Sequence, residues 1–183
     1  GDARQGTVQF VAVGSTDGDI DQSGPLALSG RTDAIITSFA SDGSINWATQ
    51  LGSEFEDVAT AVTADGQNIY VAGTTRNSDS SAATEPDALV GLGDLNPEIG
   101  PGGGTDSFLA ALDVQTGQVR WITRMGSAAD ESTTGLATTE EGLLVLSGIT
   151  AGQVSSTPPA GRTDGFLLAF QLPTSGGAAA SSI

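Results

Sequence analysis

Three carboxylates at alternate positions, Asp17, Asp19 and Asp21, have the spacing in this sequence that is most typical of a metal site. Alternate carboxylates in a tight loop can converge on one hard cation, as in the first half of an EF-hand loop. The sequence departs from an EF-hand, since Gln22 follows the third carboxylate and Leu28 is at the twelfth position. Two interpretations therefore stand, a looser Ca²⁺ loop or a solvated acidic turn.

A second acidic cluster, Glu54, Glu56 and Asp57, could supply the pair of carboxylates that glycoside hydrolysis uses. That chemistry needs one acid with a raised pKa and a fixed separation between the two acids. The chain has no His and no Cys, which excludes an imidazole base, thiol catalysis, zinc fingers and disulfides. We predict that the protein is not an enzyme, and a carboxylate-based glycosidase or lyase is the third hypothesis. Residues 94–98 are a weaker candidate for a metal loop.

The charge balance of the 183-residue chain limits its partners. The chain has 22 acidic and 6 basic residues, and its formal net charge is −16. This balance argues against a nucleic-acid binder that neutralises phosphates and against docking on an anionic membrane. No segment approaches the roughly 20 consecutive apolar residues of a membrane span. An acidic chain without cysteine favours an extracytoplasmic location, which is periplasmic, cell-surface or secreted.

The pattern Gly-x-Thr-Asp-x-apolar-apolar occurs three times, with its aspartates at Asp33, Asp106 and Asp164. Their recurrence favours a structural role over catalysis, and we expect them to cap backbone N–H groups in the preceding turn. Trp47 and Trp121 also recur, each five residues before a Gly-Ser pair. We expect both indoles to pack inside the fold and not to form a platform for sugars.

Turn residues divide each repeat unit into short segments typical of β-strands. The turns contain Gly43, Gly66, Gly117 and Gly142. The expected strands of the two units are 33–40, 45–52, 57–64 and 68–74, then 106–113, 119–126, 132–138 and 143–149. One further strand is expected near each end, at 7–14 and 164–172. Apolar residues occupy both alternating sets of positions in the first strand of each unit, so both faces of each sheet should be covered.

Successive four-stranded units of nearly constant length are typical of β-propeller blades. We therefore predict an all-β fold of β-propeller-type four-stranded blades, two of them complete, with one strand at each end. The blades span about 32–75 and 105–150, on either side of a long insertion at 76–104. We expect residues 1–173 to form a single β-propeller-like repeat domain and 174–183 to form a flexible tail. A closed ring needs about four to eight blades, so we expect an incomplete or partner-completed propeller.

The same residues resemble a known family. The order Gly-x-Thr-Asp-x-Phe, Gly-x-x-x-Trp, Gly-Ser with a following acid, and Tyr-Val-x-Gly-x-Thr is similar to the bacterial β-propeller repeats of the SBBP type. The similarity covers roughly residues 7–172, and the long insertion and Thr133-Thr134-Gly135 depart from the pattern. The resemblance implies a propeller fold, an extracytoplasmic setting and surface, adhesive or scaffolding roles. It implies little about chemistry.

Unpaired strand edges are a liability that native proteins cover. We therefore expect missing sequence, a protein partner or a second copy at the edge strands 7–14 and 164–172. The apolar half of the insertion could cover a partner or its own blade. The predicted function is a non-catalytic structural or interaction module of an extracytoplasmic assembly. The alternative is a carbohydrate- or ligand-binding propeller module, with or without Ca²⁺.

The candidate Ca²⁺ loop at 17–21 gives a first prediction. An ion that binds the folded chain stabilises it through ligand linkage, so Ca²⁺ should raise the midpoint of thermal unfolding. The measurement is a pair of melting curves, one with Ca²⁺ and one with a chelator. An unchanged midpoint would leave the solvated acidic turn as the correct interpretation.

Overall fold

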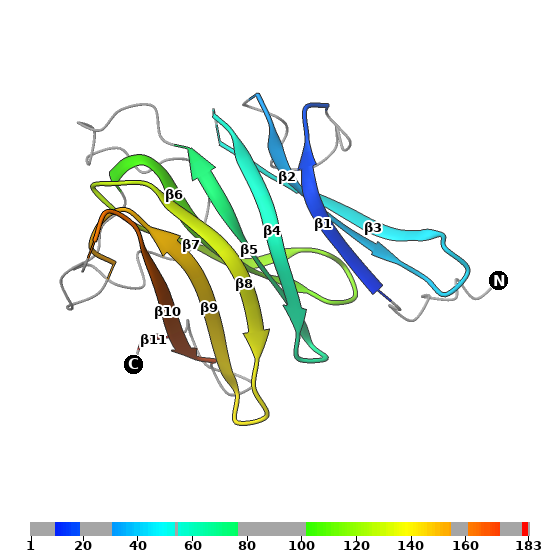
Figure 1. The fold of residues 1–183 in the computed structure, drawn as a ribbon. Helices are drawn as coiled ribbons and strands as arrows, with labels where there is room; N and C mark the ends of the chain where they lie inside the picture. The colour runs from blue at the N-terminus through cyan, green and yellow to red at the C-terminus, as the bar shows by residue number, and fades with distance from the viewer. Residues whose placement is uncertain are drawn as a thin grey trace.

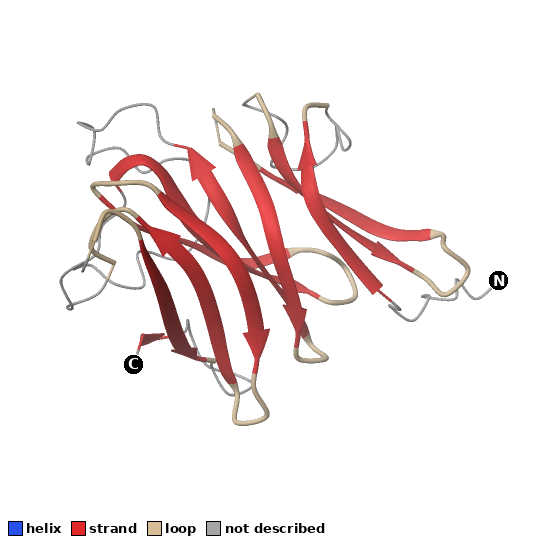
Figure 2. Ribbon diagram, in the orientation of Figure 1, coloured by secondary structure: helices blue, strands red, loops and turns tan. Residues whose placement is uncertain are grey.

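The structure is a computed structural model, and it describes residues 10–18, 31–53, 55–76, 102–154, 161–172 and 181–182. All regular structure in these ranges is β-strand, and none of the ranges contains a helix (Figure 2). Accordingly, no helix in the described residues is long and apolar enough to cross a membrane. The predicted all-β class is confirmed.

Eleven strands follow one another along the described ranges. Their bounds are β1 Phe10–Thr16, β2 Asp33–Phe39, β3 Ile45–Leu51, β4 Asp57–Ala64, β5 Asn68–Arg76, β6 Gly102–Asp113, β7 Val119–Ser127, β8 Glu131–Thr138, β9 Leu143–Thr150, β10 Asp164–Gln171 and β11 Ser181–Ser182. All ten strands predicted from the sequence are present, and most of their ends lie within two residues of the expected ones. The sequence did not indicate β11.

The strands form three antiparallel sheets. The first sheet has the order β1-β2-β3, the second β4-β5-β6-β7 and the third β11-β10-β9-β8. Figure 1 shows the second sheet between the other two. One cluster of buried apolar residues joins Ile36 of the first sheet to Phe108 of the second. Another joins Leu109 of the second sheet to Leu146 of the third, so the middle sheet is covered on both faces, as predicted.

The grouping of strands into sheets corrects the predicted blades. The strands expected as one blade at 32–75 belong to two sheets, since β2 and β3 pair with β1 whereas β4 and β5 pair with β6 and β7. The strands expected as a blade at 105–150 are divided in the same way. The chain leaves one sheet and begins the next after the pairs Gly52-Ser53 and Gly126-Ser127. Within the described ranges the three sheets form an open stack, and no closed ring is present.

Four hairpins join β2 to β3, β4 to β5, β6 to β7 and β8 to β9. Each hairpin turn contains one glycine with a positive φ, and these are Gly43 at 82°, Gly66 at 90°, Gly117 at 70° and Gly142 at 79°. This left-handed conformation is open to glycine and costly for most other residues. The predicted turn glycines therefore fix the positions where the strands reverse.

In the second and third sheets, a glycine in one strand makes room for an aromatic ring on the next strand. Gly73 of β5 pairs with Phe108 of β6, and Gly148 of β9 pairs with Phe166 of β10. A Cβ atom on Gly148 would lie 2.2 Å from the Phe166 ring. A Cβ atom on Gly73 would lie 2.7 Å from the Phe108 ring and 2.0 Å from the carbonyl oxygen of Val58. These two positions therefore exclude any side chain.

The repeat supplies a matched test of this close packing. Gly73→Ala should lower the free energy of unfolding by about 1–3 kcal/mol, because the new methyl group overlaps backbone that cannot move aside. Gly14 is the equivalent residue of β1, and a Cβ atom there would lie 4.0 Å from its nearest neighbour on Ile35. Gly14→Ala should be neutral or slightly stabilising. Urea unfolding measures both variants, and equal losses of stability would contradict the explanation.

Candidate functional site

At each crossover between sheets, a serine and a buried carboxylate are joined by two hydrogen bonds. Between β3 and β4, the backbone N–H and the hydroxyl of Ser53 donate to Asp57 Oδ2 at 2.6 and 2.7 Å. Between β7 and β8, the same two groups of Ser127 donate to Glu131 at 2.7 and 2.6 Å. Asp57 and Glu131 are both almost fully buried. The acids that follow the Gly-Ser pairs therefore hold the start of each sheet against the end of the preceding one.

The recurring aspartates of the Gly-x-Thr-Asp pattern also have structural partners. Gln50 Nε2 donates to Asp33 Oδ2 at 3.1 Å, and Arg124 Nε lies 3.7 Å from Asp106 Oδ2. Asp164 Oδ2 accepts a hydrogen bond from the backbone N–H three residues earlier at 3.2 Å. The expected backbone cap is therefore present at Asp164, whereas Asp33 and Asp106 are held by side chains of the neighbouring strand. All three contacts fit the predicted structural role.

The acids at the two crossovers, Asp57 and Glu131, differ in length by one methylene group. This difference decides whether the threonine on the paired strand has a hydrogen-bond partner. Thr150 Oγ1 donates to Glu131 Oε1 at 2.7 Å, so both carboxylate oxygens of Glu131 have partners. Thr75 pairs with Asp57 in the same way as Thr150 pairs with Glu131. Asp57 Oδ1 and Thr75 Oγ1 are buried without a hydrogen-bond partner. A buried polar atom without a hydrogen-bond partner lowers the free energy of unfolding by about 1–3 kcal/mol.

This difference predicts the effects of two reciprocal substitutions. Asp57→Glu should raise the free energy of unfolding by about 1 kcal/mol, because the longer side chain can reach Thr75. Glu131→Asp should lower the same quantity by about 1–3 kcal/mol, because it removes the bond to Thr150. Urea unfolding of each variant is the measurement. Thr75→Val supplies the control background, because it removes the hydroxyl that the longer side chain would reach. In that background Asp57→Glu should not raise the free energy of unfolding above that of Thr75→Val alone, and a gain equal to that in the wild-type background would refute the explanation.

Of the candidate acids for glycoside hydrolysis, the structure describes Glu56 and Asp57 and does not bring their carboxylates together. Asp57 is buried in its bonds to Ser53, whereas Glu56 is partly exposed and pairs with Arg76 at 2.7 Å. Adjacent residues of a strand point to opposite faces, so these two carboxylates diverge. Glu54 lies outside the described residues. The part of this cluster that the structure describes holds the fold together.

The candidate Ca²⁺ loop lies only partly within the structure. Asp17 is described, whereas Asp19, Asp21 and the weaker candidate 94–98 lie outside the described residues. Beside Asp17, the hydroxyl of Thr16 accepts a hydrogen bond from the backbone N–H two residues later at 3.1 Å. In the described part of the chain, no three His, Cys, Asp or Glu residues are grouped so that they could hold a metal ion.

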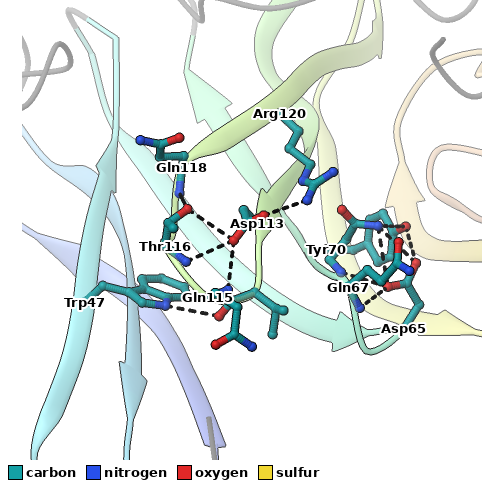
Figure 3. Close-up of polar contacts among 11 residues, drawn as sticks. Trp47, Asp65, Gln67, Tyr70, Asp113, Gln115, Thr116, Gln118 and Arg120 are labelled. Atoms are coloured by element: carbon teal, nitrogen blue, oxygen red, sulfur yellow. Dashed lines mark hydrogen bonds and ion pairs between the residues drawn. The ribbon is translucent and has the colours of Figure 1, made fainter. Parts of the chain in front are cut away.

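Both tryptophans pack against other parts of the fold, as expected for packing residues. Trp47 Nε1 donates to the carbonyl oxygen of Val114 at 3.2 Å, which ties the first sheet to the turn between β6 and β7 (Figure 3). Trp121 packs against the second apolar cluster, where its ring centroid lies 6.2 Å from that of Tyr70. Both indoles are half-buried. This arrangement disfavours a sugar platform at these positions.

Asp113 organises the hairpin turn that receives Trp47 (Figure 3). Its Oδ1 accepts hydrogen bonds from the backbone N–H groups of Gln115 and Thr116 at 2.9 and 3.0 Å. Its Oδ2 accepts a hydrogen bond from Arg120 at 2.6 Å. The Arg120 contact, together with those backbone bonds, lowers the pKa of Asp113. This acid is therefore a charged turn former and is not poised to exchange a proton.

Asp65 has the same role in the hairpin between β4 and β5. The Tyr70 hydroxyl donates to Asp65 Oδ2 at 2.7 Å, and the backbone N–H groups of Gln67 and Asn68 donate to Oδ1 at 2.9 and 2.8 Å. Burial opposes the charge of Asp65, but these bonds outweigh it and lower the pKa of the carboxyl. Burial and the bond to Asp65 raise the pKa of Tyr70 well above its usual value. The pair therefore stays as a neutral phenol and a carboxylate at neutral pH.

The first sheet has an outward face that carries exposed apolar side chains. Phe39 pairs with Phe10 on one side and with Ile45 on the other, so the three residues share a face. Val11 and Ile36 point the other way, into the first apolar cluster. Phe10 is 52% exposed and Ile45 62% exposed, and the rings of Phe10 and Phe39 stack with centroids 4.7 Å apart. We call this surface the first-sheet open face.

The third sheet has a second outward face. Leu167 is 70% exposed and Ile149 is 44% exposed. Leu146, Phe166 and Leu168 alternate with them along β9 and β10 and point into the second apolar cluster. We call the surface around Leu167 and Ile149 the third-sheet open face. Sequence periodicity showed apolar residues on both faces of the strands, but it could not show which sheets end the stack.

Comparison with known proteins does not assign the chain to a family. No family model matches the sequence, and a search of the curated proteins finds no match. The similarity to SBBP-type repeats therefore remains a resemblance carried by the motifs. Inference about function rests on the side chains and their arrangement.

Proposed function

We propose that the chain is a non-catalytic structural and interaction module of propeller-type blades, which joins an extracytoplasmic assembly through its ends. The observation that carries this proposal is the position of the apolar surface. Every large apolar side chain that is exposed in the described residues lies on one of the two open faces. Exposed apolar patches of this kind mark protein interaction sites in soluble proteins.

The strand edges support the same proposal. β1 pairs only with β2 in the described part of the chain. β10 pairs with β11 only through Phe170 and Gln171, so 164–169 has no strand on that side among the described residues. An unpaired edge offers backbone N–H and C=O groups to another strand. In the described residues, these edges overlap the segments 7–14 and 164–172 that the sequence indicates as partner sites.

The acidic residues support a non-catalytic role. Asp33, Asp57, Asp106 and Glu131 are buried, and each contacts a side chain of its own sheet or crossover. Asp57 and Glu131 hold the start of the second and third sheets, whereas Asp33 and Asp106 contact the neighbouring strand. Their burial closes all four carboxylates to a substrate. The absence of His and Cys removes the commonest alternative bases and nucleophiles. An extracytoplasmic setting is supported by the acidic, cysteine-free composition.

Polar substitution on the open faces should separate association from folding. Leu167→Gln and Ile45→Gln should each shift the mass in sedimentation velocity toward that of a single chain, because they remove apolar surface from the proposed contact. Neither variant should change the unfolding free energy by more than about 0.5 kcal/mol, since both side chains are exposed. Gln118→Ala, at an exposed hairpin position, is the control and should leave the mass unchanged. A wild-type chain that sediments as a single chain at every concentration would contradict the proposal.

A further inference from the structure

We propose that the two open faces are the two halves of one interface, so that the third sheet of one copy stacks on the first sheet of a second copy. This inference rests on the proposed function and names the occupant of each face as another copy of this chain. It follows from the positions that the repeat assigns to the outward side chains.

Each sheet turns an equivalent set of residues toward the sheet that precedes it. In the second sheet, the residues buried against the first are Ile69, Val71, Phe108, Ala110 and Leu112. In the third sheet, the residues that contact the second are Leu144, Leu146, Phe166, Leu168 and Phe170. Counted from the strand glycine and from the repeated aspartate, the same positions in the first sheet are Phe10, Ala12, Ile35, Thr37 and Phe39. The first-sheet open face is therefore built to receive a preceding sheet.

The opposite faces follow the same rule. The second sheet covers the third with Tyr70, Ala72, Leu109 and Ala111. The equivalent positions of the third sheet are Val145, Ser147, Leu167 and Ala169. The third-sheet open face is therefore of the type that covers a following sheet. The first-sheet open face of another copy is of the complementary type, because its positions are those that contact a preceding sheet.

The chemistry of the two faces suits direct contact. Neither set of outward positions contains a charged residue, although the chain as a whole has a formal net charge of −16. Stacking these faces therefore buries no unpaired carboxylate, whose loss of hydration would oppose association. The stacked pair of Phe10 and Phe39 supplies a large apolar area on one side, and Leu167 supplies the exposed apolar side chain on the other.

The number of sheets decides the size of the assembly. The described residues of each copy form three sheets, so those of two copies form six. Rings of small stacked sheets close with about four to eight sheets. This range includes the six sheets of two copies and excludes the nine sheets of three copies. Copies that associate head to tail form a closed ring when the rotations between successive copies add up to a full turn. In a ring of two copies, the same interface occurs twice. Such a ring leaves neither apolar face exposed.

Complementation between two face variants tests the arrangement. Ala12→Glu places a charge at an exposed position of the first-sheet open face, and Leu167→Glu does the same on the third-sheet open face. Wild-type chain should have the mass of two copies in sedimentation velocity, and each variant alone should have the mass of one. An equimolar mixture should recover the two-copy mass through one interface, because the intact third sheet of one variant meets the intact first sheet of the other. The second interface of that mixed pair joins the two substituted faces and should stay open.

The outcomes separate this inference from the proposed function. If wild-type chain assembles but only one of the two variants dissociates it, like faces pair with like faces, and the head-to-tail arrangement is wrong while the module function stands. An assembly larger than two copies overturns the closed ring. A wild-type chain of single-copy mass overturns both proposals. Ile45→Glu and Ile149→Glu, on the same two faces, replace either variant whose melting curve shows that it does not fold.

Discussion

A small sheet with apolar side chains on both faces must be covered on both faces, and the rest of this structure depends on that constraint. The second sheet meets it, since Phe108 and its neighbours contact the first sheet and Leu109 and its neighbours contact the third. The close packing of Gly73 under Phe108 shows how tightly the strands are matched. Among the described residues, the first and third sheets are covered on one face only. We propose that another protein surface covers their outward faces.

The polar residues at the crossovers serve the same stacking. Ser53 and Asp57 fix the step from the first sheet to the second, and Ser127 and Glu131 fix the step to the third. Burying a carboxylate is costly unless hydrogen bonds satisfy it, and here two donors from one serine bond each acid. Thr150 completes the set at Glu131, whereas Asp57 Oδ1 has no partner among the described residues. This local geometry explains why an acid recurs after each Gly-Ser pair. The repeated acids that could suggest chemistry are thus the means by which one sheet leads into the next.

The sequence was sufficient to predict the strands, because turn glycines such as Gly117 and alternating apolar residues act over a few positions. It also predicted the packing of Trp47 from its recurrence. It misplaced the boundaries of the sheets, because a repeating pattern can be divided into units at any point. The point at which the chain passes from one sheet to the next is marked by the hydrogen bond from Ser53 to Asp57, four residues later. The open faces could not be predicted, since Leu109 and Leu167 occupy equivalent positions and differ only in having a sheet beside them.

The central claim is that the ends of the stack are covered by a second copy of the chain. Small-angle X-ray scattering of the unmodified protein tests it most directly, because the forward scattering reports the mass of the particle in solution. The account predicts twice the 18.2 kDa of one chain, in a compact particle whose size does not grow with concentration. A particle of 18.2 kDa across the accessible concentrations would contradict it.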